Sequence, residues 1–254
     1  MVLNWLRRRG IISSFLICVI VSSGFYGCST DTTTNNTTHT GVAGYTLTHF
    51  TAEWKDIAAT GSYFLYNDPD TGYTSLALPF DFPYDDSIVR AGTNITIGVN
   101  GAISLSPGVL DPNGSALANP AYPGMLCIFS GNLVAGRLLT DPSYADTDFY
   151  EVDGVAPNRV LTVEYHWLHF RGTGGGPGGQ TGGGGLRIPM QVKLYETTGT
   201  IEFIYKDHNY NFSDTASVAD TLGIGLNGFH IPFVSNVYAS GVYATPATDL
   251  RWTR

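Results

Sequence analysis

The chain has 254 residues, a net charge of −8 and 13% charged residues, which is about half the charged share usual in globular proteins. This acidic composition argues against a nucleic-acid partner and against a polybasic membrane patch. Hydrophobic residues make up 43% of the chain, enough for one ample core.

The N-terminus predicts export. Three arginines at positions 7–9 precede a short apolar run that is broken by Ser and Gly and ends at Cys28. A membrane-spanning helix needs about 20 apolar residues, so the run is better explained as a signal peptide over residues 1–27. Its layout resembles a bacterial lipoprotein signal, which implies acylation of Cys28 and a lipid anchor in the outer membrane, at the cell surface. Ordinary cleavage near Gly27, which would release a secreted protein, is the alternative.

Residues 28–42 are rich in Thr and Asn and predict a flexible tether. Cys127 lies in an apolar run, where a buried thiol is expected. If Cys28 is not acylated, a disulfide between Cys28 and Cys127 is the alternative in an oxidising compartment.

Residues 43–254 predict a single all-β domain. Short runs alternate apolar and polar residues and are separated by turn residues. The best helical candidate, residues 51–60, is one or two turns at most. The fold expected is an antiparallel two-sheet sandwich, jelly-roll-like and with little helix. The strands are expected near residues 45–49, 74–82, 94–99, 102–106, 125–130, 148–152, 159–170, 187–196 and 200–206.

The clearest hairpin joins residues 187–196 to residues 200–206. It predicts the pairs Leu194–Ile201, Val192–Phe203 and Lys193–Glu202. The apolar faces then agree and opposite charges meet. On this pattern Glu202 faces outward, as Glu164 does on its own strand.

Two Asn-Gly dipeptides, at 100–101 and 227–228, predict chain reversals of different kinds. Around the first, a three-residue loop over residues 99–101 pairs Ile97 with Ile103 and puts Gly101 in a left-handed conformation. Around the second, a two-residue turn would instead give the pairs Leu226–Phe229 and Ile224–Ile231.

Five segments carry a family resemblance. They are "LALPFDFPYDD", "ITIGVNGAISL", "NRVLTVEYHWLHF", "MQVKLYETTGTIEFIYK" and "ADTLGIGLNG", in this order. The string resembles a β-sandwich domain of secreted and surface-anchored bacterial proteins, broadly similar to the nidogen-like extracellular module. The resemblance implies an extracellular domain of structural or adhesive character with no established catalysis. It departs at "GMLCIFSGNL", where relatives have an Asp-containing stretch, so a role of that Asp does not carry over.

The glycine tract at residues 172–185 predicts a long surface loop. A strand pattern follows the tract and no Lys lies within it, which argues against a phosphate-binding loop. A flexible contact surface for a partner is the alternative.

Two oxygen-rich stretches are candidates for calcium. One offers Asp146, Asp148 and Asp153, and the other spans residues 67–72. Neither has EF-hand spacing, and Asp-Gly pairs are ordinary in turns. No other cofactor is expected.

No catalytic group stands out. Glu164 and Glu202 could face a cleft and do hydrolytic work, but solvated residues on an outer face are the simpler interpretation. His166 and His169 are three apart, so on a strand they face opposite ways and cannot share one metal. No nucleophile motif is present. We therefore expect no enzyme, with a glycoside hydrolase centred on Glu164 as the most distant alternative.

Tyr63, Tyr66 and Tyr73 flank the turn at residues 67–72. Exposed tyrosine rings there could stack on sugars, while packing within the loop is the simpler interpretation. Taken together, the sequence predicts an exported, lipid-anchored protein with a structural or adhesive role at the bacterial cell surface. Its partner would be a surface protein or a polysaccharide, and a carbohydrate-binding module is the first alternative.

Overall fold

The computed structural model describes residues 42, 44–68, 70–108, 122–135, 148–166, 168–170, 188–208, 223–229 and 245–254. All of them belong to one compact unit, residues 34–254. No helix occurs among them, and every strand pairing is antiparallel. In the same residues, no helix is long and apolar enough to cross a membrane.

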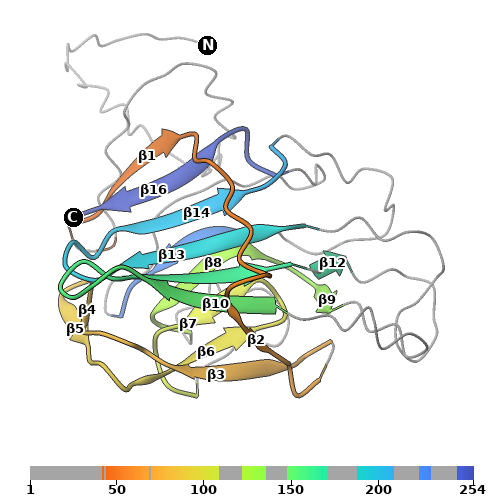
Figure 1. Ribbon diagram of the computed structural model, residues 1–254, viewed down its shortest axis with the longest axis horizontal. Coiled ribbons are helices and arrows are strands. Elements are labelled where there is room, and N and C mark those ends of the chain that lie inside the picture. The colour runs from red at the N-terminus through yellow and green to blue at the C-terminus, as the bar shows by residue number, and fades with distance from the viewer. Residues whose placement is uncertain are drawn as a thin grey trace, which may run out of the picture. The chain divides into compact units, whose positions relative to one another are not determined.

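The larger sheet has seven strands in the order β1-β16-β14-β13-β11-β10-β2 (Figure 1). Its edge strands are therefore β1 and β2, which are consecutive in the chain. The bounds are β1 Thr46–Phe50, β2 Ser62–Phe64, β10 Asp148–Asp153, β11 Val160–Tyr165, β13 Met190–Tyr195, β14 Ile201–Tyr205 and β16 Asp249–Thr253.

The second sheet has five strands in the order β15-β8-β7-β6-β3. Two-stranded ribbons, β4-β5 and β9-β12, complete the described pairings. The bounds are β3 Tyr73–Ala77, β4 Phe82–Tyr84, β5 Ser87–Val89, β6 Asn94–Gly98, β7 Ala102–Ser104, β8 Met125–Ser130, β9 Leu133–Ala135, β12 Leu168–Phe170 and β15 Gly223–Asn227.

The core lies between the two sheets. One cluster of buried side chains takes alternate residues of the large sheet, such as Val163, Val192 and Phe203, and apolar residues of the five-stranded sheet. Two tyrosines span the sandwich: Tyr165 donates to the carbonyl of Ala102 on β7, and Tyr205 donates to the carbonyl of Ile128 on β8. Buried hydroxyls need such acceptors, so these bonds fix how the sheets face each other. The predicted two-sheet sandwich is confirmed.

The predicted hairpin is confirmed in full, with Leu194 opposite Ile201, Val192 opposite Phe203 and Lys193 opposite Glu202. The carboxylate of Glu202, however, accepts from Arg251 Nε at 2.6 Å and from the hydroxyl of Tyr195 at 2.7 Å. The strand register was therefore predictable, while the ion partner of Glu202 came from a strand almost fifty residues away.

The first Asn-Gly turn is also confirmed. Ile97 pairs with Ile103 across a three-residue loop, and Gly101 has φ +70°. A Cβ on Gly101 would lie 2.5 Å from the carbonyl oxygen of Phe129, so both the conformation and the close approach require glycine. Cys127, as expected, is a buried thiol in β8.

The turn expected at Asn227-Gly228 is wrong. β15 pairs with β8 and ends at Asn227, Phe229 belongs to no strand, and the N–H of Phe229 donates to Asp85. Asn227 donates its side-chain amide to the carbonyl of Tyr122. Long-range pairing with β8 has overridden the local turn signal. The second expected pair involves Ile231, which lies outside the described residues.

Candidate functional site

The site begins with the chain that joins the two edge strands of the large sheet. Residues 51–61, here called the crossing segment, leave β1 and must reach β2 at the opposite edge. Figure 1 shows this chain running over β14, β13 and β10. The segment is irregular, ending in a turn, so the short helix considered for residues 51–60 does not form. It covers the face of the sheet that is turned away from the core.

Two carboxylates on this face require a second correction. Glu164 and Glu202 were expected on a solvated face, yet they are 0% and 4% exposed. A buried carboxylate must be hydrogen-bonded to persist, and both of these are. The alternation of the strands was predictable, but it does not show what covers an outward residue. Glu164 contacts the crossing segment, whereas Glu202 contacts Arg251 and Tyr195 of its own sheet.

Glu164 holds the middle of the crossing segment. Its Oε2 accepts the backbone N–H of Ile57 at 3.0 Å and the side-chain amide of Gln191 at 2.6 Å. Its Oε1 lies 2.8 Å from Nδ1 of His166. Gln191, on the neighbouring strand β13, also donates to the carbonyl of Lys55. We call Glu164, His166, Gln191 and the N–H of Ile57 the Glu164 clamp.

Asp249 holds the beginning of the segment. Its Oδ2 accepts the N–H of Ala52 at 2.7 Å, and its Oδ1 accepts the N–H of Tyr205 at 2.9 Å. The same Oδ1 lies 2.9 Å from Nε2 of His208. Asp249 is 0% exposed. These four groups form the Asp249 clamp, in which most donors are backbone N–H groups.

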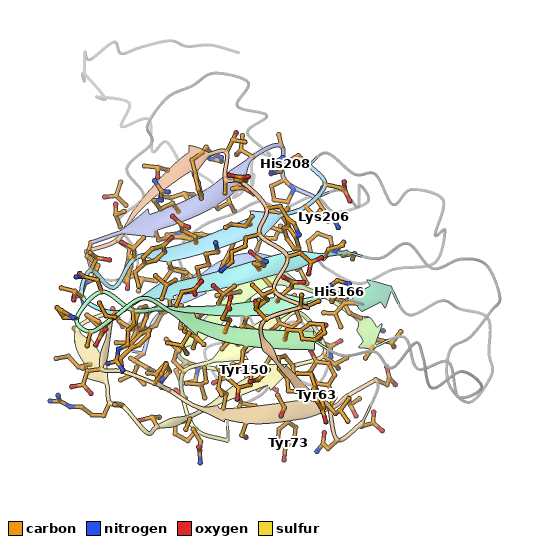
Figure 2. All side chains as sticks on the ribbon, in the orientation of Figure 1. Tyr63, Tyr73, Tyr150, His166, Lys206 and His208 are labelled. Atoms are coloured by element: carbon orange, nitrogen blue, oxygen red, sulfur yellow. The ribbon has the colours of Figure 1, made fainter. Side chains whose placement is uncertain are left out.

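The charge of the Glu164 clamp acts on its histidine. The hydrogen bond to Glu164 raises the pKa of His166 above the ordinary 6.5, burial opposes the rise, and the charges of Glu164, Asp56 and Asp148 add to it. The ring also packs edge-on against Phe149, with centroids 5.8 Å apart. His166 is only 23% exposed and lies at the end of β11, where Figure 2 labels it.

Asp56 brings a second carboxylate to this place. One donor atom each of Asp56, Glu164 and His166 lies within 4.8 Å of the others. Asp56 is exposed, and its Oδ1 accepts the N–H of Ala58. Neighbouring Lys55 pairs with Glu151 and Asp153 of β10 at 3.2 and 2.7 Å. Lys55 and Asp56 of the crossing segment thus lie near charged residues of the sheet.

The calcium candidates are not brought together. Asp148 and Asp153 are the two ends of β10, about 16 Å apart at the rise of a strand. Asp148 is buried and accepts from Tyr66 and from the N–H of His166, while Asp153 pairs with Lys55. Asp146 lies outside the described residues. The two described residues therefore cannot share one ion.

The second calcium candidate, residues 67–72, is a closed turn. Oδ1 of Asp68 accepts the N–H groups of Asp70 and Thr71, both at 2.9 Å, and the hydroxyl of Thr71. These bonds lower the pKa of Asp68. This carboxylate is committed to shaping its own loop.

The three candidate tyrosines separate into two kinds. Tyr66 packs on the core, edge-on against Phe64, and its hydroxyl donates to Asp148 at 2.5 Å. Burial and the charge of Asp148 raise its pKa well above the ordinary value. Tyr66 therefore does not offer a free ring. Tyr63 and Tyr73 are 67% and 45% exposed and are labelled in Figure 2.

Tyr63 and Tyr73 lie on the two edge strands that the closed turn joins. Tyr63 is on β2, at the edge of the large sheet, and Tyr73 is on β3, at the edge of the five-stranded sheet. Asn67 stabilises the turn, since its side-chain oxygen accepts the N–H of Tyr73 at 2.8 Å. Leu65, 57% exposed, lies between them in the chain. Half of the exposed large apolar residues among those described fall in this stretch.

Sequence reasoning missed the cluster of Asp56, Glu164 and His166. Strand alternation placed Glu164 and His166 on one face, but the partner that completes the cluster comes from residues 51–61, a stretch without a strand pattern. The available signal was the absence of a strand pattern in a long connection that contains three charged residues, Glu53, Lys55 and Asp56. Cys28 and the glycine tract at 172–185 lie outside the described residues, as does the side chain of His169.

The fold and these surfaces define a β-sandwich module whose seven-stranded sheet is covered on its outer face by the crossing segment. The chain belongs to the NIDO related family, whose model matches residues 44–251. Membership indicates an extracellular module, in agreement with the nidogen-like resemblance of its strand segments. No match was found among curated proteins or among solved structures.

Proposed function

We propose that this extracellular module has a structural or adhesive binding role at the bacterial cell surface, without catalysis, and is exported and lipid-anchored through Cys28. The observation that carries the binding role is the exposure of Tyr63 and Tyr73 on the edges of the two sheets, with Leu65 between them. Exposed aromatic rings on a rigid frame give contact area at low entropic cost. The partner proposed is a cell-surface protein or a polysaccharide, and not nucleic acid.

The state of Glu164 supports a role without hydrolysis. A general acid or nucleophile must reach its substrate, whereas Glu164 is 0% exposed and uses both oxygens to hold Ile57, Gln191 and His166. Both of its oxygens are occupied by hydrogen bonds of the clamp that fastens the crossing segment. Hydrolysis of a broad glycoside panel by the wild type that is abolished in Glu164→Gln would contradict this part of the proposal.

A binding screen tests the tyrosine surface. Purified protein is offered to arrays of extracellular proteins and of polysaccharides. Tyr63→Ala and Tyr73→Ala should each weaken any specific capture by about 10-fold, the scale of one interfacial hot spot. Val155→Ala is the matched control, because Val155 is 79% exposed but lies beyond the far end of β10. Equal loss in all three variants would contradict a localised binding surface.

A carbohydrate-binding module is the second candidate, and the same two rings favour it. A tyrosine face stacks on the apolar face of a sugar while its hydroxyl reaches the edge. Tyr66 takes no part in this version, since its hydroxyl is committed to Asp148. Capture confined to the polysaccharide arm, and lost in both tyrosine variants, would select this candidate; capture confined to the protein arm would remove it.

The lipid anchor has its own test. Acylation of Cys28 adds the mass of the lipid to a mature N-terminus that begins at that residue. Mass spectrometry of the N-terminal peptide from the native host should show the modified cysteine, and Cys28→Ser should move the protein from the membrane fraction to the medium. An unmodified residue 28 in the mature wild type would leave the secreted alternative.

A further inference from the structure

We infer that Asp56, Glu164 and His166 form a binding site for one divalent metal ion of the zinc class, which fastens the crossing segment to β11. Three potential ligands converge here from two parts of the chain. Asp56 comes from the crossing segment, while Glu164 and His166 come from the end of β11. One donor atom of each lies within 4.8 Å of the other two. The site lies beyond the proposed binding role of the tyrosine surface and does not depend on it.

The distances are close to those of a coordinated ion. Ligands about 2.1 Å from a tetrahedral zinc ion are about 3.4 Å from one another. Nδ1 of His166 and Oε1 of Glu164 are 2.8 Å apart, so an ion replacing the shared proton has to spread them by about 0.6 Å. Asp56 has to move inward, and it can do so because its side chain is exposed on an irregular segment. Only small side-chain adjustments are needed.

The buried ligand is already held in place. Oε2 of Glu164 receives the N–H of Ile57 and the amide of Gln191, which leaves Oε1 directed at His166. Gln191 is itself fixed by its bond to the carbonyl of Lys55 at 2.6 Å. Hydrogen-bonded outer groups of this kind orient metal ligands and support their affinity. The carboxylate therefore needs no reorganisation to bind.

The donor set selects the class of metal. Calcium and magnesium take oxygen ligands, whereas one imidazole nitrogen with two carboxylate oxygens suits zinc and its first-row neighbours. Two carboxylates also balance the charge of a divalent ion. With three protein ligands, water completes a tetrahedral shell. The ion would couple the side chain of Asp56 directly to the sheet, in addition to the hydrogen bonds that already hold the backbone of Ile57 and of Lys55.

The Asp249 clamp supplies a matched control. His208 and Asp249 form an acid–histidine pair of nearly the same separation, 2.9 Å, but they are not part of a three-ligand cluster in the described part of the chain. His208→Gln should therefore leave zinc binding unchanged. Asp56→Asn is the most informative variant, because Asn keeps an oxygen for the N–H of Ala58 while removing the charge that an ion requires.

The test is calorimetric titration of the metal-stripped full chain with zinc chloride near neutral pH. Wild type and His208→Gln should each bind one equivalent of zinc with the same affinity. The affinity for zinc should fall at least about 10-fold in Asp56→Asn and in His166→Gln, since even the loss of an outer-shell group costs that much. Identical isotherms in all four proteins would overturn the inference, and so would an equivalent that is lost only in His208→Gln. Calcium chloride in place of zinc should give no heat that depends on Asp56; if it does, the assignment of metal class is wrong.

A second measurement separates binding from folding. Zinc in excess should raise the melting temperature of wild type and of His208→Gln by mass action, and that of Asp56→Asn by a smaller amount because its affinity is lower. Without zinc, Asp56→Asn and wild type should melt together, because the changed side chain is exposed. A variant that melts low without zinc yet still gains the full shift would count against Asp56 as a ligand.

Discussion

The two clamps of the crossing segment use the same pair of side chains and build it differently. Each has a carboxylate that is 0% exposed, a histidine at 2.8 or 2.9 Å, and one backbone N–H of the segment. In the Asp249 clamp the remaining donor is the backbone N–H of Tyr205. In the Glu164 clamp it is the side chain of Gln191.

This difference separates a structural group from a candidate site. Asp249 completes a sheet: the pairing of β14 with β16 ends at Phe203 and Leu250, and the N–H of Tyr205 just beyond it is satisfied by the Asp249 side chain. The N–H of Tyr205 belongs to β14 and cannot move without moving that strand. Glu164 is held largely by side chains and has an additional carboxylate, Asp56, at hand. The same acid–histidine chemistry is therefore rigid at one end of the segment and adaptable in its middle.

The largest expected effect compares Asp249→Asn with Glu164→Gln. Both oxygens of Asp249 accept backbone N–H groups, so the amide nitrogen of Asn must face one of these donors whichever way it turns. We expect a loss of about 3 kcal/mol in the free energy of unfolding. Gln at position 164 can keep its oxygen toward Ile57 and donate its amide to a neutral His166, for a loss of about 1 kcal/mol. Urea unfolding of the two variants measures both.

The comparison has an internal control. Glu164→Leu removes every acceptor of the Glu164 clamp and should be as destabilising as Asp249→Asn, because Ile57 and Gln191 then lose their buried partner. If Glu164→Gln is instead as harmful as Asp249→Asn, the middle clamp is as rigid as the first, and the difference drawn between them fails.

The fold was predictable because its signals are local and repeated. Alternation along the strands gives the β13–β14 register, and Asn100-Gly101 gives the first turn, since a glycine with φ above zero serves where no other residue fits. The turn at Asn227-Gly228 was not predictable: its outcome depends on β8, Asp85 and Tyr122, which are remote in sequence.

The candidate site was only half predictable for a related reason. Strand periodicity places Glu164 and His166 on one face, but it contains no information on what covers that face. The cover is the crossing segment, whose path follows from β1 and β2 being opposite edges of one sheet. Sheet order, not periodicity, therefore brings Asp56 to Glu164 and buries a carboxylate that the pattern alone would leave in water.

The next largest expected effect is a pH dependence of the stability that His166 contributes. The pKa of His166 is raised by its hydrogen bond to Glu164 and further by the charges of Glu164, Asp56 and Asp148, against the effect of burial. A raised pKa in the folded state means that the contribution is complete below the ordinary 6.5 and is lost as pH rises through the folded value. In chelator-treated protein, His166→Gln should cost about 1 kcal/mol more at about pH 5.5 than at about pH 8.5.

A background variant tests the cause assigned to this pH dependence. In Glu164→Gln the main source of the raised pKa is gone, so adding His166→Gln should produce nearly the same loss at both pH values. A pH-dependent loss that survives unchanged in this background would assign the effect to Asp56 or Asp148. In that case the ion pair between Glu164 and His166 would not be what distinguishes the Glu164 clamp from the Asp249 clamp.

The smallest expected effect on stability concerns an aromatic residue of the crossing segment that lies between the two clamps. Trp54 is half-buried in the crossing segment, and the ammonium of Lys206 lies 5.7 Å from the centroid of its ring. A cation over an aromatic ring at an exposed position contributes about 0.5 kcal/mol, so Lys206→Met, which keeps the apolar stem, should reduce stability by about that amount. A double-mutant cycle with Trp54→Leu isolates the coupling. A coupling as large as the Asp249→Asn loss would mean that the segment is held by its middle aromatic residue. The two carboxylates would then be buried as a consequence of the crossing rather than as its cause.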